Sequence, residues 1–296
     1  MVTCDKMPPV RPGPLLLSAA VACAVVHVAG ILFAYPLWRY AEVFTVGMLL
    51  LYAGVSGLPA PCWAVPASLA VLAVDAVRTM PADPGTAGYG WKVLQPDNGV
   101  DVPSGFEAGL TATGALLAAA ALLLVAWGRG RWRPSATAAA ALPAVLITGY
   151  AVVRVVDIAL AVRVERERYA YSVDADSAVT SVSLAVLPAL ALGLTALMLA
   201  AALAGRGRRL ASVGAALLAV VALPHLDSSI GAVQLPLYAG DRTALFSWHA
   251  IAPTLSMPHP VPALTAAVEL AGVLLLVVGS ISPRPRADAA PTPTAR

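Results

Sequence analysis

Charged residues are scarce in this chain of 296 residues. Asp, Glu, Lys and Arg make up 12% of it, whereas apolar residues make up 59% and the mean hydropathy is +0.80. A soluble domain carries about 25% charged residues, because it must cover its surface with groups that water solvates. A chain with half of that charge and several uninterrupted apolar runs is solvated by lipid. The composition therefore excludes a disordered protein and a nucleic-acid binder.

Cysteine, lysine and asparagine are also rare. The three cysteines, Cys4, Cys23 and Cys62, are odd in number and lack C-x-x-C spacing, so neither a disulfide framework nor a thiolate metal site is indicated. The chain has 17 Arg, 2 Lys and one Asn, a bias typical of GC-rich coding DNA. We therefore expect a bacterial protein, and the preference for Arg over Lys has little functional meaning.

Sequence motifs for common types of site are absent or incomplete. Walker, zincin and dinucleotide-binding motifs do not occur. No H-x-x-x-H or H-E-x-x-H spacing joins His225, His249 and His259, so a metal site is not indicated. The sequence identifies no cofactor, and no resemblance to a known family is specific enough to name.

Long apolar runs, in contrast, are abundant. A transmembrane helix needs roughly 20 mostly apolar residues to cross about 30 Å of hydrocarbon. Eight segments are predicted to span the membrane on this basis, at about 15–37, 42–58, 62–79, 107–128, 136–162, 181–204, 211–233 and 262–281. The predicted fold is an all-α, polytopic membrane helix bundle with about eight transmembrane helices. Six spans with two re-entrant segments are the alternative, because only a tight turn separates the second and third segments.

The basic residues gather on one side of this predicted bundle. With eight spans both termini share a side, and the connections 59–61, 129–135 and 205–210 lie there too. Eleven basic residues then fall on this side, opposed by only two acidic ones, Asp5 and Asp288. Because cytoplasmic loops are enriched in Lys and Arg, both termini are predicted to be cytoplasmic.

The expected organisation is one transmembrane domain, residues 1–282, in the plasma membrane, followed by a disordered cytoplasmic tail, residues 283–296. Long outer loops are predicted at 80–106, 163–180 and 235–261. The loop lengths also suggest a four-plus-four parallel repeat, since in each half a short inner turn follows the second helix and a long outer loop follows the third.

Ionisable side chains within the predicted spans indicate a functional region, because they are costly to bury in lipid. Nearly all of them fall in the outer half of the bundle, whereas the inner half has almost none. They are His27, Asp75, Arg78, Arg154, Asp157, His225, Asp227 and Glu269, with Glu42 and Glu107 at outer helix starts. The sequence therefore predicts a polar site in the extracytoplasmic half.

Local pairing is the structural explanation for four of these residues. Asp75 with Arg78, and Arg154 with Asp157, are spaced i,i+3 and can neutralise each other on one helix face. Glu269 has no partner on its own helix. It must therefore face a cavity, become protonated or pair across helices, and Arg154 is the partner we expect. Arg154 thus has three choices, namely Asp157, Glu269 or a ligand.

His225 and Asp227 follow Pro224 in the seventh predicted span. Side chains two residues apart point to nearly opposite faces of a helix, so both reach one site only if the backbone unwinds there. Pro224 either kinks the helix near its end or breaks it at a binding site, as in some transporters.

Three classes of function remain open. The first is a transporter or exporter component for a small or amphiphilic molecule, working with a partner membrane chain or ATPase or by ion coupling, with Glu269 or Asp157 as a proton relay. The second is an intramembrane enzyme that acts on a lipid, polyprenyl or terpenoid substrate, with Glu269, Asp157, Asp227 and His225 as acid–base candidates. The third is a scaffold or sensor subunit in which the charges are assembly contacts.

Four residues are the candidates for binding the substrate. Arg154 would hold an anionic group, and Asp75 lies in the same outer half of the bundle. Trp248 and His249 belong to the aromatic stretch FSWH, which is predicted to pack across the outer mouth. The expected partners are the lipid bilayer and a small-molecule or lipid substrate.

Overall fold

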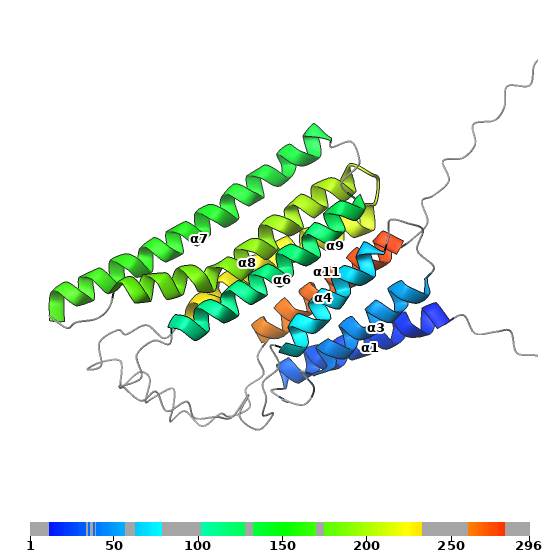
Figure 1. The fold of residues 1–296 in the computed structure, drawn as a ribbon, viewed down its shortest axis with the longest axis horizontal. Helices are drawn as coiled ribbons and strands as arrows, with labels where there is room; N and C mark the ends of the chain where they lie inside the picture. The colour runs from blue at the N-terminus through cyan, green and yellow to red at the C-terminus, as the bar shows by residue number, and fades with distance from the viewer. Residues whose placement is uncertain are drawn as a thin grey trace, which may run out of the picture.

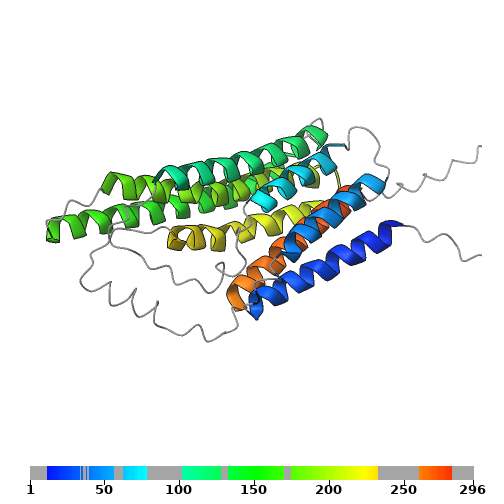
Figure 2. The same ribbon diagram turned by 60° about the horizontal axis from the view of Figure 1, so that its bottom comes forward.

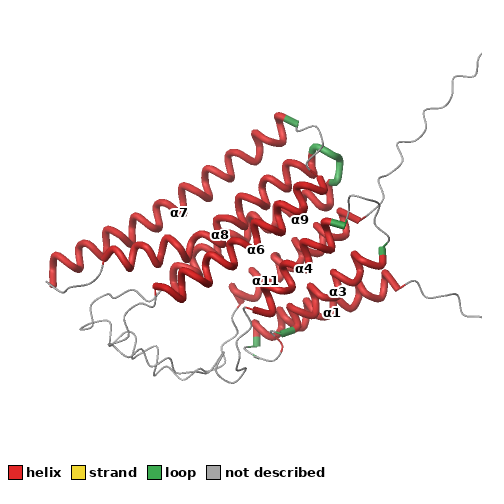
Figure 3. Tube along the Cα trace, viewed as in Figure 1, coloured by secondary structure: helices red, strands yellow, loops and turns green. Residues whose placement is uncertain are grey.

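The described part of the chain is built from helices. The computed structural model describes residues 12–33, 35, 38, 40–56, 63–78, 102–127, 133–169, 175–232 and 260–281. In these ranges there are eight helices and no strand, which confirms the all-helical prediction (Figure 1, Figure 3). They are α1 (Pro12–Leu32), α3 (Ala41–Val55), α4 (Ala64–Arg78), α6 (Val102–Trp127), α7 (Pro134–Tyr169), α8 (Ala175–Ala204), α9 (Arg209–Ala232) and α11 (Pro260–Ile281).

Five of the described helices are long and apolar enough to cross a membrane. Their apolar stretches are Gly13–Leu32, Pro134–Ala161, Val182–Ala204, Arg209–Asp227 and Pro260–Ile281. Shorter apolar stretches occur in α3, α4 and α6. The 15 residues of α3 extend about 22 Å, which is less than the hydrocarbon thickness of about 30 Å. These helices have the character of a multi-pass membrane protein.

The helix α7 corrects the predicted outer loop at 163–180. It continues to Tyr169 and α8 begins at Ala175, so most of the expected loop is helical. Its 36 residues extend about 54 Å, and its last turns project beyond the neighbouring helices in Figure 1. The prediction treated the charged stretch RVERERY as a loop. Its acidic and basic residues are spaced i,i+3 and i,i+4, however, and such spacing favours a helix.

Seven of the eight described helices form a ring. Each packs on the next in the order α1, α3, α4, α6, α8, α9 and α11, and α11 closes the ring by packing on α1. The helix α7 lies outside the ring against α8, at the upper edge of the molecule in Figure 1, and its end projects at the left in Figure 2. A four-plus-four repeat would equate α1 with α7 and α11 with α6. Because α7 has no contact with α6 in the described residues comparable to that of α1 with α11, the expected symmetry is not seen in the packing.

The helices α9 and α11 touch backbone to backbone. A Cβ atom built on Gly214 of α9 would lie 2.5 Å from the carbonyl oxygen of Gly272 and 2.5 Å from the amide nitrogen of Leu276, both on α11. A Cβ on Gly279 would collide with the backbone of Ala211. Small residues permit such approach between membrane helices, where van der Waals contact is a main source of association.

The turn between α8 and α9 holds the end of α11. Gly207 has a positive φ of 73°, and the amide of Arg208 donates to the carbonyl of Leu203 at 3.1 Å, which is the hydrogen bond of a glycine-terminated helix. Nη1 of Arg208 donates to the carbonyl oxygens of Gly279 at 2.9 Å and of Ser280 at 2.5 Å. These carbonyls lack partners within α11, because they belong to its last turn. We name this part of the bundle the Arg208 end.

We expect Arg208→Met to lower the free energy of unfolding by about 1.5–3 kcal/mol, since hydrogen bonds from a charged donor are lost. Arg209→Met is the matched control, because Arg209 is the exposed neighbour at the start of α9, and it should change the free energy by less than about 0.5 kcal/mol. The measurement is SDS-induced unfolding of the full chain in micelles. Equal losses in the two variants would show that Arg208 does not stabilise the protein through α11.

Candidate functional site

Four ionisable side chains from four helices gather away from the Arg208 end. We name them the polar cluster, which consists of His27 of α1, Glu42 of α3, His225 of α9 and Glu269 of α11. Nε2 of His225 and Oε2 of Glu269 are 2.9 Å apart, within hydrogen-bond distance. Nε2 of His27 lies 3.7 Å from Oε2 of Glu42. Glu42 is also within electrostatic range of Glu269 and His225, so the two pairs form one group.

The helix positions explain why this cluster is separate from the Arg208 end. His225 follows Arg208 by 17 residues, about 25 Å of helix. Glu269 precedes Ser280 by 11 residues, about 16 Å. Glu42 lies in the first turn of α3, where the helix dipole favours a negative charge. His225 and Glu269 therefore lie away from the Arg208 end, and their place in the extracytoplasmic half of a membrane stays a prediction.

The side chains of the cluster differ in accessibility. His27 is buried, with 9% of its side chain exposed, whereas Glu42 is 49%, His225 37% and Glu269 34% exposed. The hydrogen-bonded pair is therefore held between α9 and α11 without being sealed. A proton or a small polar group can reach Glu269 and His225 without the helices separating.

A second group of polar side chains joins α7 to α9. Oη of Tyr150 lies 2.8 Å from Oδ1 and 2.9 Å from Oδ2 of Asp227 and donates a hydrogen bond to this carboxylate. Nε of Arg154 lies 3.2 Å from Oδ1 of the same group. Tyr150 and Arg154 are spaced i,i+4 on one face of α7. We name Tyr150, Arg154 and Asp227 the α7–α9 bridge.

The bridge corrects the partners expected for Arg154. The carboxylate that pairs with Arg154 belongs to Asp227, whereas Asp157 and Glu269 were the partners considered from the sequence. Tyr150 was not predicted at all, because it carries no charge at neutral pH. Its spacing of four residues before Arg154 was the signal that sequence reasoning had available.

The backbone of α9 explains why His225 and Asp227 do not share a site. The helix runs without interruption from Arg209 to Ala232, through Pro224. Residues two apart therefore point to nearly opposite faces, so His225 meets α11 and Asp227 meets α7. The hypothesis of a helix broken at this point is wrong, and with it the idea of one site that uses both residues.

Asp157 does not join either group. Its side chain is exposed on α7 and makes no ion pair or hydrogen bond with the other residues that the structure describes. The spacing of i,i+3 with Arg154 does not produce a pair, because Arg154 is drawn to Asp227. Of the two residues expected as a proton relay, Glu269 has the partner and Asp157 has none within the described part of the chain.

Several predicted site residues lie outside the described residues. They are Trp248 and His249, together with the side chains of Asp75, Arg78 and Glu107. Their proposed roles therefore remain predictions. Within the described ranges, no three His, Cys, Asp or Glu side chains are grouped as the ligands of a metal ion would be.

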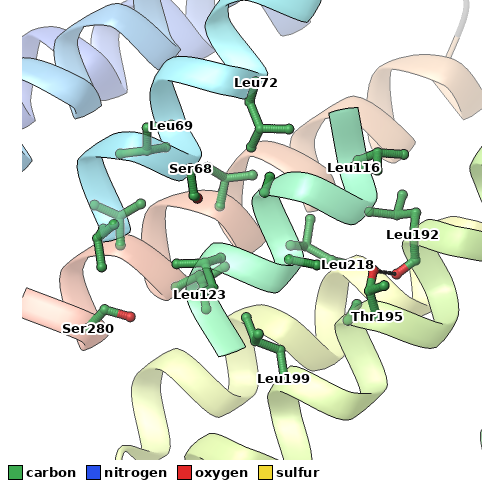
Figure 4. Close-up of a pocket in the computed structure, with 17 residues that line it drawn as sticks. Ser68, Leu69, Leu72, Leu116, Leu123, Leu192, Thr195, Leu199, Leu218 and Ser280 are labelled. Carbon is green, nitrogen blue, oxygen red and sulfur yellow. Dashed lines mark hydrogen bonds between the residues drawn. The ribbon is translucent and has the colours of Figure 1, made fainter. Parts of the chain in front are cut away.

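An apolar cavity of about 80 Å³ lies inside the ring, where α4 and α6 face α8, α9 and α11 (Figure 4). Its walls are mainly leucine, valine and alanine side chains, with the hydroxyl-bearing residues Ser68, Thr195 and Ser280. Oγ1 of Thr195 donates to the carbonyl of Ala191 at 2.6 Å. Oγ of Ser280 is buried without a hydrogen-bond partner among the described residues. Sequence reasoning missed the cavity, because in the sequence its lining resembles any helix core.

The cavity and the His225–Glu269 pair share the same faces of two helices. On α11 the lining runs from Val273 to Ser280, and Glu269 precedes Val273 by one helical turn. On α9 the cavity is lined by Leu218, and His225 follows it by seven residues, or two turns. Spacings of four and seven residues keep side chains on one helix face. The pair therefore lies one helical turn from the cavity wall along α11 and two turns from it along α9, on the side away from the Arg208 end.

Comparisons of the chain with protein-family models, curated proteins and solved structures gave no match. A function must therefore be argued from the geometry and chemistry of the site. Two features carry that argument, namely the polar cluster drawn from four helices and the apolar cavity beside it.

Proposed function

We propose that this protein is a proton-coupled transporter of a small amphiphilic molecule, in which the Glu269–His225 pair carries the proton. The observation that carries the proposal is that this pair lies on the helix faces that line a cavity inside the ring, one turn of α11 from the cavity wall. Carboxyl and imidazole groups inside membrane proteins form the proton relays of pumps and carriers. Imidazole also changes its charge near neutral pH. The pair is thus suited to bind a proton on one side of a membrane and release it on the other.

The proposal includes a topology. All eight described helices cross the plasma membrane, both termini are cytoplasmic, and the polar cluster lies in the extracytoplasmic half. Support comes from the basic residues, because Arg206, Arg208 and Arg209 all lie at the end of the bundle that would face the cytoplasm. Residues 1–282 form the transmembrane domain, and residues 283–296 form the cytoplasmic tail.

The cavity supports a transporter over an enzyme. It extends along α11 from Val273 to Ser280, where Arg208 binds the last turn, and so continues beyond the polar cluster toward the cytoplasmic side of the proposed topology. A carrier needs a path in that direction, whereas an enzyme that works from the outer face does not. The two carboxyl and two imidazole groups of the polar cluster favour an intramembrane acid–base enzyme as the second candidate.

The α7–α9 bridge has a structural role in this proposal. Tyr150 and Arg154 satisfy Asp227 from one helix, and the bridge is separated from the cavity by the body of α9. Since α7 lies outside the ring, these contacts help to hold it there. A scaffold function would need all of the charges to be paired in this way.

Access to a thiol introduced into the cavity wall separates the three candidates. In a chain with Cys4, Cys23 and Cys62 changed to serine, Val273→Cys places this thiol one turn from Glu269, and we name it the cavity thiol. We expect a membrane-impermeant maleimide to react with it both in right-side-out spheroplasts and in inside-out vesicles, because a carrier opens its site to each side in turn. Mass spectrometry measures the reaction.

The matched control is Leu264→Cys, on the exposed face of the same helix, where 66% of the leucine is exposed. In the proposed topology this face meets lipid, so the maleimide should not react with it from either side. Reaction of the cavity thiol from the outer face alone would favour the enzyme over the transporter as the function. Reaction from neither face would favour the scaffold function.

A further inference from the structure

We infer that the ligand of this site is an amphiphilic cation, with a single hydrocarbon chain in the cavity and an ammonium head at the Glu269–His225 pair. The inference rests on the proposed function and names the class of its cargo. It follows from three features of the described residues, namely the chemistry of the cavity, the groups of the polar cluster and the single helical turn of α11 that separates Glu269 from the cavity wall at Val273.

The cavity fits a hydrocarbon chain. Its walls are apolar, and an isolated charge within them would lose its hydration without gaining a partner. Along α11 its lining spans eight residues, from Val273 to Ser280, which corresponds to a rise of about 10 Å. An apolar space of this length suits an alkyl chain better than a compact polar molecule.

Ser280 lies at the end of the cavity wall that is farther from the Glu269–His225 pair. Its side chain is 2% exposed, and its Oγ atom has no hydrogen-bond partner among the described residues. In Figure 4 this residue lies at one end of the group of side chains around the cavity. Ser280 follows Glu269 by 11 residues, about 16 Å of helix, so a head group held at Glu269 does not reach it, and this end of the cavity would receive the hydrocarbon chain.

The charge of the polar cluster favours a cationic head. Glu42 and Glu269 bring two carboxyl groups to the cluster, and none of its four residues carries a permanent positive charge. Arg154 is bound to Asp227 on the other face of α9, so it does not face the cluster. An ammonium group would therefore meet a carboxylate, whereas an anionic head would meet two carboxyl groups and imidazoles that are positive only when protonated. A charge at this depth requires such a partner.

Glu269 also explains how the cation is coupled to the proton. The carboxyl group holds either a proton, shared with His225 across the 2.9 Å contact, or the ammonium head. Binding of one protonated amine to the protonated carboxyl releases one proton, and the total charge is conserved. The two cations then compete for one group, as exchange across a membrane requires.

The test is native mass spectrometry of the full chain released from micelles, with three probes of equal chain length, namely octylamine, octanol and octanoate. We expect octylamine to bind at least about tenfold more tightly than octanoate, with octanol between them. Glu269→Gln should reduce the binding of octylamine to the level of octanol and leave octanol unchanged. If octanoate binds as tightly as octylamine, the proposal that the ligand has a cationic head group is wrong.

Two alanines on α6 supply a matched pair of variants. Ala119 is buried in the cavity wall, and Ala118 is exposed beside it. Ala119→Leu fills part of the cavity and should lower the affinity for octylamine by at least about tenfold. Ala118→Leu should change this affinity by less than about twofold. Circular dichroism and a monodisperse elution profile check that both variants fold. Equal affinities of the two variants for octylamine would contradict the proposal that the hydrocarbon chain of the ligand lies in the cavity.

Failure of the ligand and failure of transport are distinguishable. Probe binding is measured at equilibrium and does not require access from both sides. If octylamine binds as expected but the cavity thiol reacts from one face only, the proposal of transport is wrong and the proposal of a cation-binding site is supported. If the cavity thiol reacts from both faces but the three probes bind alike, transport stands and the cationic ligand is wrong.

Discussion

Gly279→Leu should prevent the chain from folding into the ring of seven helices. A Cβ atom at this position collides with the backbone of Ala211, and backbone cannot move aside as a flexible side chain can. Relief requires α11 to separate from α9, which also breaks the contact between Gly214 and Gly272 and the hydrogen bonds from Arg208. We expect a loss of about 4 kcal/mol or more, which exceeds the effect of most single substitutions.

The yield of monodisperse protein in detergent measures this effect, and Gly149→Leu is its control. A Cβ atom on Gly149, on α7, meets nothing within 4 Å, so this variant should fold like the parent. Gly214→Ala tests the same interface with a smaller change and should give an intermediate yield. If Gly279→Leu folds as well as Gly149→Leu, then α9 and α11 do not touch through these glycines.

Glu269→Gln should leave the fold nearly intact and abolish the dependence of cavity access on pH. Glutamine keeps the size of the side chain and its ability to hydrogen-bond to His225, but it cannot take up or release a proton. Interhelical hydrogen bonds in a membrane contribute on average about 0.6 kcal/mol and at most about 1.7 kcal/mol, so the loss of stability should be small. The proton-dependent step, in contrast, is removed completely.

The measurement is the rate at which the cavity thiol of Val273→Cys reacts with the impermeant maleimide from each face, between about pH 5 and pH 8, where imidazole titrates. After correction for the reagent, the rates from the two faces should change in opposite directions with pH in the parent and stay constant in Glu269→Gln. Asp157→Asn is the control, because Asp157 is exposed and lies outside the polar cluster. A pH dependence that survives in Glu269→Gln would assign the proton to another group and remove Glu269 from the relay.

A double-mutant cycle on His225 and Glu269 separates pairing from proton transfer. A purely structural pair would show coupling in the free energy of unfolding and no change in the pH profile of the cavity thiol. A relay changes the profile in each single variant, whatever the stability. The two measurements on the same set of proteins therefore distinguish a relay from an assembly contact.

The sequence alone determined the helices and the distribution of polar groups along them. Runs of about 20 apolar residues are a local property that the bilayer thickness requires, so the helices could be located without knowledge of their neighbours. The positions of His225 and Glu269 along their helices followed from counting residues, whereas their depth in a membrane stays a prediction. Even the missed end of α7 had a local signal, in the i,i+3 and i,i+4 spacing of its charges.

The tertiary structure alone decided which of these groups meet. Asp227 binds Arg154 because α7 lies outside the ring beside α8 and α9, and no spacing within one helix carries that information. The same is true of the cavity, whose walls come from five helices that each look like ordinary core. Partners across helices depend on the order of the ring and on the rotation of each helix. At the contact of α9 with α11, small residues such as Gly214 and Gly279 contribute to both, because they permit close approach at one face of each helix.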